Sequence, residues 1–239
     1  MAFNHACTQS YRHSRGNQSN LVACRIMEPE LERLRAERPH VTGVHYLDQS
    51  LHRTPQKMPG LVQAAVDAAS EAAGRVVLGY GLCSNGIIGV QARGREMIVP
   101  RCHDCIPFFL GSAEAHRREM AAHPGTYYLT PGWIAERKDP LGIIEDDYVK
   151  RVGREMGEWA MREELKNYTR IALVDTGVGD IEPLRARAQE NAHFFGMIYQ
   201  EIEGRSLEYF AKLMDGPYDE AEFLRLNPGE PVTQAMFMG

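Results

Sequence analysis

The sequence predicts an α/β fold in which a mostly parallel sheet carries helices on both faces. Short apolar runs alternate along the chain with helical patterns, and this alternation is typical of parallel strands joined by helices. Parallel strands of this kind are usually covered by helices on both faces of the sheet. With 239 residues, 44% of them hydrophobic and 25% charged, the chain can bury a substantial core.

The individual elements follow from these patterns in chain order. The expected strands are runs rich in Val, Ile, Leu and Tyr, at residues 21–27, 41–47, 75–80, 96–100, 126–130, 171–175, 197–202 and 231–236. The expected helices carry apolar residues at helical spacing, at residues 29–38, 59–74, 112–124, 146–168, 183–196, 206–214 and 219–226. Pro29 suits a first helical turn, Ser112 is a good N-cap, and Gly74 and Gly196 are placed to end their helices.

The first residues of the chain differ from the rest. Residues 1–20 are polar and lack the apolar core of a secretory signal. We expect residues 1–20 to be a disordered-looking N-terminal extension and residues 21–239 to form a single α/β domain. The weakest point of that domain is the segment 133–145, which contains Pro140 and Gly142, so a division into two lobes stays open.

Net charge and composition argue against nucleic-acid-binding and membrane-spanning proteins. A net charge of −5 argues against a nucleic-acid-binding protein, which usually carries a basic surplus or a basic stripe. No apolar run approaches the roughly 20 residues that a membrane-spanning helix needs. Five cysteines without a secretory signal indicate thiols and not a disulfide framework, so we expect a cytoplasmic protein.

Four of the five cysteines follow predicted strands. Cys24 lies near the end of the first strand, Cys83 follows the third, and Cys102 and Cys105 follow the fourth. In open parallel sheets, ligands bind beyond the carboxyl ends of the strands, so these thiols are expected on one rim. Cys7 lies in the N-terminal extension and is left out of the site.

The cysteines differ in how strongly they indicate function. Cys24 sits inside an apolar strand, where a free cysteine that merely fills the core is an equal alternative. Cys83 sits among glycines in GYGLCSNG, where the backbone turns tightly and can approach a ligand. We expect Ser84 or Asn85 to cap a following helix, whose dipole would favour the Cys83 thiolate.

The segment RCHDC places Arg101, Cys102, His103, Asp104 and Cys105 in a row. No second Cys-x-x-Cys pair completes a zinc ribbon, and a plain redox dithiol leaves Cys24 and Cys83 unexplained. A metal ion or iron–sulfur cluster shared by several loops explains them better. His103 is a candidate for metal ligation, proton transfer or a structural role. Asp104 is a candidate helix cap, and Arg101 is a candidate for binding an anion or forming a surface ion pair.

Further candidates for substrate binding lie at or near the ends of other strands. They are Tyr80, Asn85, Trp133 and Asp175. Packing explains a buried tryptophan equally well. The chain contains no phosphate loop with a Gly-Lys-Ser/Thr ending, no dinucleotide-binding fingerprint after its first strand and no G-x-S-x-G elbow.

The chain resembles the bacterial and archaeal DUF1638 family, a domain of unknown function. The resemblance extends over residues 21–229 and is carried by the segments ACRIMEPELE, HYLDQSLHRTPQKM, LGYGLCSNGIIGV, IVPRCHDCIPFFLGS, HPGTYYLTPGW and ALVDTG. It implies that the site contains Cys24, Cys83, Cys105, His103 and Asp104, with Cys102 as an optional fourth thiol. Some relatives occur in genomes and operons devoted to corrinoid-dependent methyl transfer, which implies a context and no particular reaction.

We expect a metal- or iron–sulfur-dependent enzyme that acts on a small anionic or sulfur-containing molecule. Cys24, Cys83 and Cys105 would hold a [4Fe-4S] cluster with one open iron, or a zinc ion, and the open position would act as a Lewis acid. His103 would act as the general acid and base, and Asp104 would orient His103. Arg101 and Asn85 would anchor the substrate.

Two alternatives use the same thiols. In the first, an accessory protein carries a metal, a methyl group or a corrinoid for a methyltransferase or a corrinoid protein. In the second, a metal-free enzyme uses Cys83 or Cys105 as its nucleophile. Neither nucleic acid nor a membrane is an expected partner, and homo-oligomerisation stays open.

Overall fold

The computed structural model describes residues 18–238, which form two compact units. Among the described residues, unit 1 contains 18–25, 34–105 and 210–238, and unit 2 contains 26–33 and 106–209. The chain therefore crosses from one unit to the other four times. Two crossings fall inside helices, namely α2 (Glu28–Arg35) and α11 (Ser206–Asp215).

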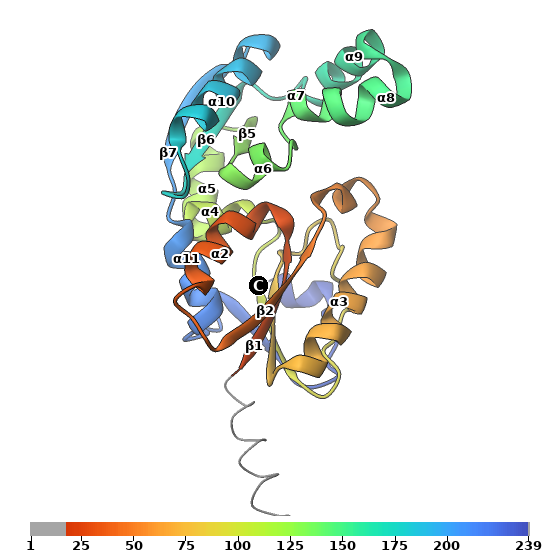
Figure 1. Ribbon diagram of the computed structural model, residues 1–239, viewed down its shortest axis with the longest axis vertical. Coiled ribbons are helices and arrows are strands. Elements are labelled where there is room, and N and C mark those ends of the chain that lie inside the picture. Colours follow the sequence, from red (N-terminus) through yellow and green to blue (C-terminus); the bar gives the residue numbers. More distant parts are fainter. Residues whose placement is uncertain (1–17, 239) are drawn as a thin grey trace, which may run out of the picture. The chain divides into compact units, whose positions relative to one another are not determined.

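Unit 1 contains a five-stranded sheet in the order β2–β1–β3–β4–β8. Its strands β1 and β2 are labelled in Figure 1. Its strands are β1 Ser19–Cys24, β2 Val41–Leu47, β3 Arg75–Gly79, β4 Glu96–Pro100 and β8 Phe223–Leu226. The first four are parallel, whereas β8 runs antiparallel to β4. The central strands are buried along almost their whole length, which explains why their sequences are apolar and do not alternate.

Helix α3 (Met58–Ala72) packs against this sheet. Its buried residues Met58, Val62, Val66 and Ala69 recur at three- and four-residue spacing and form one apolar stripe. The chain between α3 and β3 is short, so the helix brings the polypeptide back to the start of the next parallel strand.

Unit 2 contains a separate three-stranded parallel sheet in the order β5–β6–β7. Its strands are β5 Thr126–Leu129, β6 Arg170–Asp175 and β7 Ile198–Glu203. Its helices, besides parts of α2 and α11, are α4 Ile106–Leu110, α5 Ala113–Ala122, α6 Pro131–Ala135, α7 Pro140–Ile143, α8 Val149–Val152, α9 Arg154–Glu164 and α10 Ile181–Phe195. Ala188 and Ala192 of α10 pack on Leu129, Ile171 and Leu173 of the sheet.

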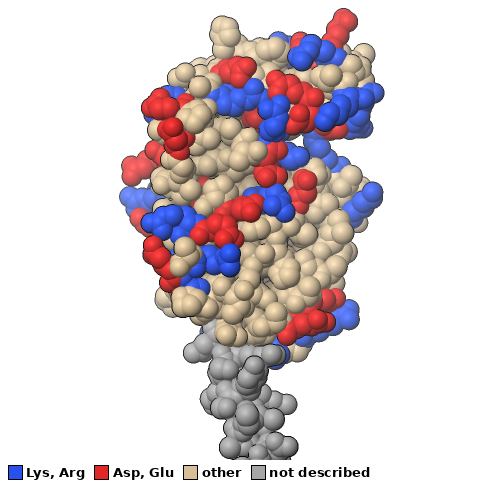
Figure 2. Space-filling model, viewed as in Figure 1, with Lys and Arg blue, Asp and Glu red and all other residues tan. Residues whose placement is uncertain are grey.

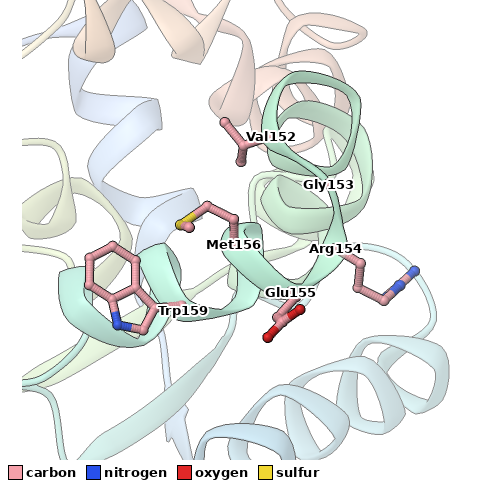
Figure 3. Close-up of a pocket in the computed structure, with 6 residues that line it drawn as sticks. All are labelled: Val152, Gly153, Arg154, Glu155, Met156 and Trp159. Carbon is pink, nitrogen blue, oxygen red and sulfur yellow. The ribbon is translucent and has the colours of Figure 1, made fainter.

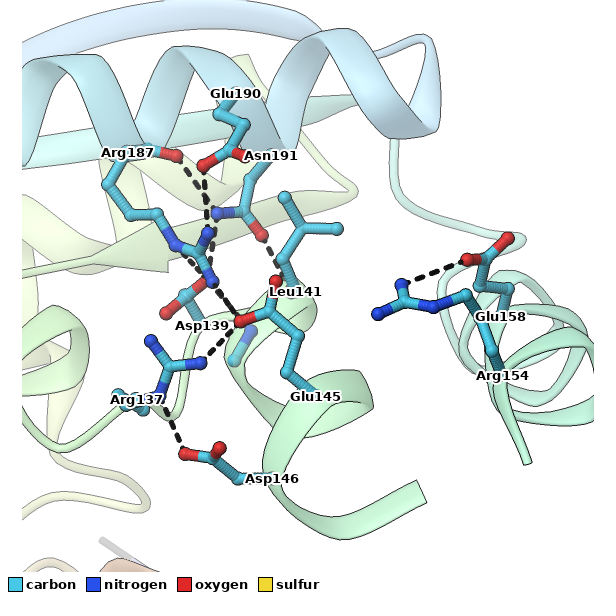
Figure 4. A network of polar contacts seen from close by, with 11 residues as sticks. Arg137, Asp139, Leu141, Glu145, Asp146, Arg154, Glu158, Arg187, Glu190 and Asn191 are labelled. Atoms are coloured by element: carbon cyan, nitrogen blue, oxygen red, sulfur yellow. Dashed lines mark hydrogen bonds and ion pairs between the residues drawn. The ribbon is translucent and has the colours of Figure 1, made fainter. Parts of the chain in front are cut away.

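A buried carboxylate ties the start of α7 to α10 (Figure 4). Asp139 Oδ2 accepts hydrogen bonds from Asn191 Nδ2 at 2.8 Å and from Arg187 Nε at 2.9 Å. The same oxygen accepts the backbone N–H of Gly142 at 3.1 Å, which caps α7. Asn191 Oδ1 in turn accepts the N–H of Leu141 at 3.0 Å. The network therefore satisfies two backbone N–H groups of α7, one with its own N-cap and one with a side chain of α10.

The α/β character and the mostly parallel strand arrangement are confirmed. Strands 41–47 and 96–100 have the expected bounds, and Ser112 caps α5 by accepting the N–H of Ala115 at 3.0 Å. Helix α10 ends at Gly196, which takes the expected left-handed conformation.

Several predicted elements are wrong. The expected helix 219–226 contains the antiparallel strand β8, because its four residues pair with β4 at the edge of the sheet. The expected strand 231–236 is replaced by a coil and a short 3-10 helix, Gln234–Phe237. The expected single helix 146–168 is interrupted at Gly153, whose φ of 81° is incompatible with a continuous helix.

The first strand begins earlier in the chain than expected. Ser19 and Asn20 are buried residues of β1, so the ordered chain begins before residue 21, while residues 1–17 with Cys7 lie outside the described residues. The segment 133–145 lies wholly within unit 2. The unit boundaries fall instead beside Arg25, Leu34, Cys105 and Phe210.

Surface charge is mixed on the face shown in Figure 2, where basic and acidic side chains lie close to one another. In the described part of the chain, no helix is both long and apolar enough to cross a membrane.

Candidate thiol site

The candidate site lies in unit 1, where three neighbouring parallel strands end. Strand β1 pairs with β3, with Ala23 opposite Gly79, and β3 pairs with β4. Cys24 is the last residue of β1, and the loops that follow β3 and β4 carry the other described cysteines. The strand order therefore brings the three sequence-distant segments to one edge of the sheet.

Backbone hydrogen bonds join the loop after β3 to the loop after β4. The N–H of Leu82 donates to the carbonyl of Cys102 at 2.8 Å, and the N–H of Cys83 donates to that of His103 at 2.9 Å. Gly81 allows this close approach, because a Cβ atom there would lie 2.6 Å from the Asp104 carbonyl oxygen. The two loops are thus held as a pair, and Gly81 has a steric reason to be glycine.

Cys83 begins a turn with unusual backbone geometry. Cys83, Ser84 and Asn85 have φ values of 48°, 56° and 68°, so three successive non-glycine residues are left-handed. The N–H of Gly86 closes the turn on the Cys83 carbonyl at 3.1 Å. The expected helix capped by Ser84 or Asn85 is therefore wrong, because residues 83–89 form turns and not a helix. Each left-handed residue of this kind costs about 1–2 kcal/mol, so the surrounding packing must impose the turn.

Two sulfurs from different loops are in contact. The Sγ atoms of Cys83 and Cys105 lie 3.4 Å apart, well beyond a disulfide bond, and both side chains are buried. The pKa of Cys105 is raised well above its usual value, first by the hydrogen bond shared with Cys83 and then by burial. Burial also raises the pKa of Cys102, with the charges of Cys105 and Asp104 acting in the same direction.

Tyr80 connects Cys24 to this pair. Its ring and hydroxyl are buried, and the hydroxyl makes no hydrogen bond to a nitrogen or oxygen of the described residues. Burial raises the pKa of Tyr80, and the sulfurs of Cys24, Cys105 and Cys83 raise it further, with a side-chain hydrogen bond to Cys24. The Tyr80 hydroxyl is therefore a shared neighbour of three thiols that come from three strand ends.

The other expected site residues occupy varied environments. His103 and Asn85 are exposed, and Asp104 is partly buried between the two cysteines of its loop. Arg101 Nη1 donates to the Met236 carbonyl at 3.0 Å, while its buried Nε has no partner among the described residues. His103 is therefore open to solvent, and Arg101 keeps one donor for another group.

Trp133 and Asp175 belong to unit 2. Trp133 packs edge-on against Phe109, with ring centroids 5.6 Å apart, and adjoins the core of the small sheet. Asp175 is exposed and accepts the N–H of Gly177 at 2.9 Å, which shapes the turn after β6. Both side chains thus have structural roles in their own unit.

A family model described as a protein of unknown function, DUF1638, matches residues 46–214. The chain belongs to the DUF1638 family. The matched span includes Cys83, Cys102 and Cys105, whereas Cys24 precedes it. No curated protein and no solved structure matches the chain significantly.

The geometry places the candidate site at the paired loops with their sulfurs. Among residues 18–238, no three His, Cys, Asp or Glu side chains are already close enough to hold a metal ion. Sequence reasoning missed the steric role of Gly81 and the left-handed residue Ser84. The glycine-rich run was the only signal for either, because nothing in the identity of Ser84 indicates a left-handed backbone.

Proposed function

We propose that unit 1 binds a soft metal ion, or an iron–sulfur cluster, through thiolates of Cys24, Cys83 and Cys105 and acts on a small anionic or sulfur-containing molecule. The observation that carries the proposal is the 3.4 Å contact between two buried sulfurs from separate loops. Thiolate ligands favour zinc, copper(I) and iron–sulfur centres over hard cations. A soft cation would remove the thiol protons and replace the sulfur–sulfur contact with two metal–sulfur bonds.

The spacing of the sulfurs favours one ion over a cluster. Tetrahedral zinc with Zn–S bonds of about 2.3 Å places two thiolate sulfurs about 3.8 Å apart. The observed 3.4 Å is a few tenths of an ångström shorter, so small side-chain rotations suffice for Cys83 and Cys105. In a cluster each cysteine binds its own iron, which requires a wider separation of these two sulfurs.

The third ligand requires a movement. Cys24 lies against the Tyr80 hydroxyl, which also neighbours the Cys83 and Cys105 sulfurs. A three-thiolate set would require the Cys24 side chain to turn from Tyr80 toward the pair, and Cys102 in the adjoining loop is an optional fourth. Three ligands leave one position open, as in catalytic zinc sites.

The surrounding residues would support chemistry at such a centre. The bound ion would supply Lewis acidity at its open position. His103 is exposed at the loop surface and would exchange protons with solvent and substrate, with Asp104 next to it in the chain. Arg101 would anchor an anionic group through its guanidinium, and Asn85 extends from the exposed side of the left-handed turn.

The test is the metal and acid-labile sulfide content of protein purified without oxygen. We expect close to one zinc or one iron–sulfur centre per chain, and a large loss of it in Cys83→Ala and Cys105→Ala. Cys7→Ala is the matched control, because it removes a thiol that the sequence analysis leaves outside the site. Unchanged metal content in both loop variants would overturn the proposal.

The same samples distinguish the metal-free alternative. A cysteine nucleophile needs access to its substrate, whereas Cys83 and Cys105 are 5% and 6% exposed. If no metal is found and only one of these two thiols reacts with iodoacetamide, the hypothesis of a metal-free cysteine nucleophile replaces that of a metal site. Metal binding without turnover, together with stable co-purification of a corrinoid protein or methyltransferase, would instead support an accessory carrier.

A further inference from the structure

Unit 2 has an open apolar pocket and, elsewhere, a buried cluster of polar side chains. The pocket lies at α8 and α9, where Val152, Met156 and Trp159 are more than half exposed (Figure 3). The polar cluster lies at the carboxyl ends of the three parallel strands. Solvent can satisfy an exposed side chain, whereas a buried polar atom needs a partner inside the protein or a bound ligand. The buried cluster therefore says more about binding than the open pocket does.

Three side chains of this cluster contain an oxygen atom that makes no hydrogen bond within the described part of the chain. The atoms are Glu30 Oε2, Thr130 Oγ1 and Ser206 Oγ. All three residues are fully buried. Most buried polar atoms in native proteins have a hydrogen-bond partner, so three unpaired oxygens in one unit indicate that something else binds there.

Thr130 and Ser206 come from the strands on either side of β6. The parallel pairing of β5 with β6 places Thr130, which directly follows β5, beside the last residues of β6. Gly204, which directly follows β7, donates its N–H to the carbonyl of Asp175 at the end of β6, at 2.7 Å. Ser206 comes two residues later in the chain. Both hydroxyl-bearing residues therefore lie at the carboxyl end of the central strand, where ligands of parallel sheets usually bind.

The segment that contains Glu30 packs on this same end of the sheet. Thr176, which directly follows β6, donates its hydroxyl hydrogen to Glu30 Oε1 at 2.8 Å. A Cβ atom on Gly132, in the segment after β5, would overlap the carbonyl oxygen of Ile26. Residues 26–30 therefore lie against the chain that follows both β5 and β6.

The buried carboxyl of Glu30 has no basic partner. Within residues 18–238, no lysine, arginine or histidine acts on it, and burial is the largest cause of the rise of its pKa from 4.5 to about 7. The hydroxyl of Thr176 satisfies only one of the two carboxyl oxygens. A buried carboxylate is costly unless a cation or hydrogen bonds compensate its charge. A cation bound beside the second oxygen would supply the missing positive charge.

We propose that Glu30, Thr130, Thr176 and Ser206 form a binding site for one monovalent alkali-metal cation, K⁺ or Na⁺. All donor atoms are oxygens, which hard cations prefer, whereas the sulfurs of unit 1 suit a soft ion. One carboxylate balances one positive charge. Divalent cations usually bind through more carboxylates or keep several water ligands, and residues 18–238 contain no group of three acidic, His or Cys side chains that could hold a metal ion.

The cation site is independent of the thiol site. Its four residues belong to unit 2, whereas Cys24, Cys83, Cys102 and Cys105 belong to unit 1. The cation would join α2 to the segments that follow the three strands, so it would stabilise the folded state of unit 2. Alkali-metal cations exchange with the buffer, so this site does not contribute to the zinc or iron content that tests unit 1.

The test is urea unfolding of the full chain at pH 8 in KCl, NaCl or choline chloride at equal ionic strength. Both tryptophans belong to unit 2, so tryptophan emission follows the unit that contains the site. Choline is too large for a buried site of this kind and serves as the reference cation. At a K⁺ or Na⁺ concentration of about ten times the dissociation constant, the folding equilibrium constant should be about tenfold higher than in choline chloride. The salt with the larger effect identifies the preferred ion.

Two outcomes of this comparison would overturn the proposal. Equal unfolding midpoints in the three salts, up to molar concentration, would mean that the unpaired oxygens bind only water. Stabilisation by CaCl₂ without any stabilisation by KCl or NaCl would mean that the site binds a divalent cation.

Variants identify the ligands. Glu30→Gln keeps the shape of the side chain but removes its charge, so it should abolish the difference between KCl or NaCl and choline chloride. Thr130→Val and Ser206→Ala each remove one oxygen and should raise the apparent dissociation constant about tenfold. Asp175→Asn is the matched control, because Asp175 is an exposed carboxylate at the end of the same strand. Circular dichroism checks that each variant is folded.

The same salt comparison on these variants separates the buried site from general effects of salt. An effect of KCl or NaCl that persists unchanged in Glu30→Gln and Thr130→Val assigns the cation to another surface and refutes the proposal. Equal loss of the effect in Asp175→Asn would do the same. Cys83→Ala should keep the full effect, so a failure of the thiol site and a failure of the cation site are distinguishable.

Discussion

The residues at the carboxyl ends of the parallel strands differ between the two units. In unit 1, the strand ends and the loops after them carry buried thiols, with Cys83 and Cys105 in contact. In unit 2, the residues that directly follow β5 and β6 are Thr130 and Thr176, and both are buried. Thr176 Oγ1 donates a hydrogen bond at 2.8 Å to Glu30, a carboxyl that is fully buried on α2.

This difference shows what topology alone decides. The carboxyl ends of parallel strands gather loops in both units, but the loop residues determine what can bind there. The sulfurs of unit 1 suit a soft ion and lie next to a strained turn, whereas the Thr176 hydroxyl of unit 2 donates a hydrogen bond within the fold. The proposed function places the chemistry in unit 1, so we expect changes at the strand ends of unit 2 to leave the zinc or iron content of the protein unchanged.

The largest expected effect comes from breaking the polar network of unit 2. Asp139→Ala removes the carboxylate that accepts hydrogen bonds from Arg187 and Asn191. We expect a loss of about 3–5 kcal/mol in the free energy of unfolding, because one partner of a buried charged network is missing. Both tryptophans belong to unit 2, so urea unfolding followed by tryptophan emission measures this unit directly.

A matched control for this network is Asp146→Ala. Asp146 pairs with Arg137 at 2.6 Å on the surface, and exposed pairs contribute little. If the two variants unfold at the same urea concentration, the buried network does not stabilise unit 2 as argued. Metal content should be unchanged in both, and its loss in Asp139→Ala would weaken the separation of roles between the units.

The next effect is expected in the paired loops of unit 1. In Gly81→Ala, the added methyl group would meet backbone atoms of Asp104 and Cys102, which cannot rotate away as a flexible side chain can. We expect a loss of roughly 3 kcal/mol in stability, separation of the two loops and faster reaction of the buried thiols with Ellman's reagent.

Gly60→Ala provides the comparison for Gly81. Gly60 lies in α3 of the same unit, and a Cβ atom there would have no neighbour within 4 Å. We expect this change to stabilise the protein by about 0.5–1 kcal/mol, because alanine has the higher helix propensity. Equal thiol reactivity in the two variants would show that Gly81 does not hold the loops together.

A pH-dependent effect is expected from Glu30. Burial raises its pKa from 4.5 to about 7, while the hydrogen bond from Thr176 opposes the shift. The unfolded chain releases this proton near pH 4.5 and the folded chain near pH 7, so stability falls as the pH rises between these values and then levels off. Glu30→Gln should remove this fall and, above pH 7, raise the unfolding free energy by about 2–3 kcal/mol.

Urea unfolding of both proteins from pH 4 to pH 8, followed by the tryptophans of unit 2, measures the difference. At the acid end the two curves should coincide, since Glu30 is then protonated in both states. A constant difference across the whole range would show that Glu30 is not titrating in the folded protein.

The sequence predicted the elements whose patterns are local. The apolar runs of β2 and β4 have the observed bounds, and the rule for carboxyl ends of parallel strands correctly placed Cys24, Cys83, Cys102 and Cys105 on one rim. These inferences hold because buried parallel strands leave a continuous apolar signature. The assignment of a metal or a reaction to that rim stays a prediction.

The parts that sequence reasoning missed depend on tertiary contacts. The run FLRL in β8 is short enough to suit a helix or a strand, and only pairing with β4 decides between them. Glu30 looks like an exposed position of an amphipathic helix, yet it is buried because its helix covers the Thr176 turn. The left-handed backbone at Ser84 has no signature in the residue itself.

The smallest expected effect concerns that left-handed turn. Ser84→Gly removes the backbone strain of a left-handed non-glycine residue, which is about 1–2 kcal/mol. Glycine also raises the conformational entropy of the unfolded chain, which costs about 0.5–1 kcal/mol of stability. We therefore expect a net stabilisation of about 0.5–1 kcal/mol. The turn holds Cys83 against Cys105, so a more flexible backbone should also weaken metal binding. Competition with a zinc chelator measures that affinity, and chemical unfolding measures the stability. Tighter or unchanged metal binding in Ser84→Gly would show that the strain does not help to preorganise the thiols of unit 1.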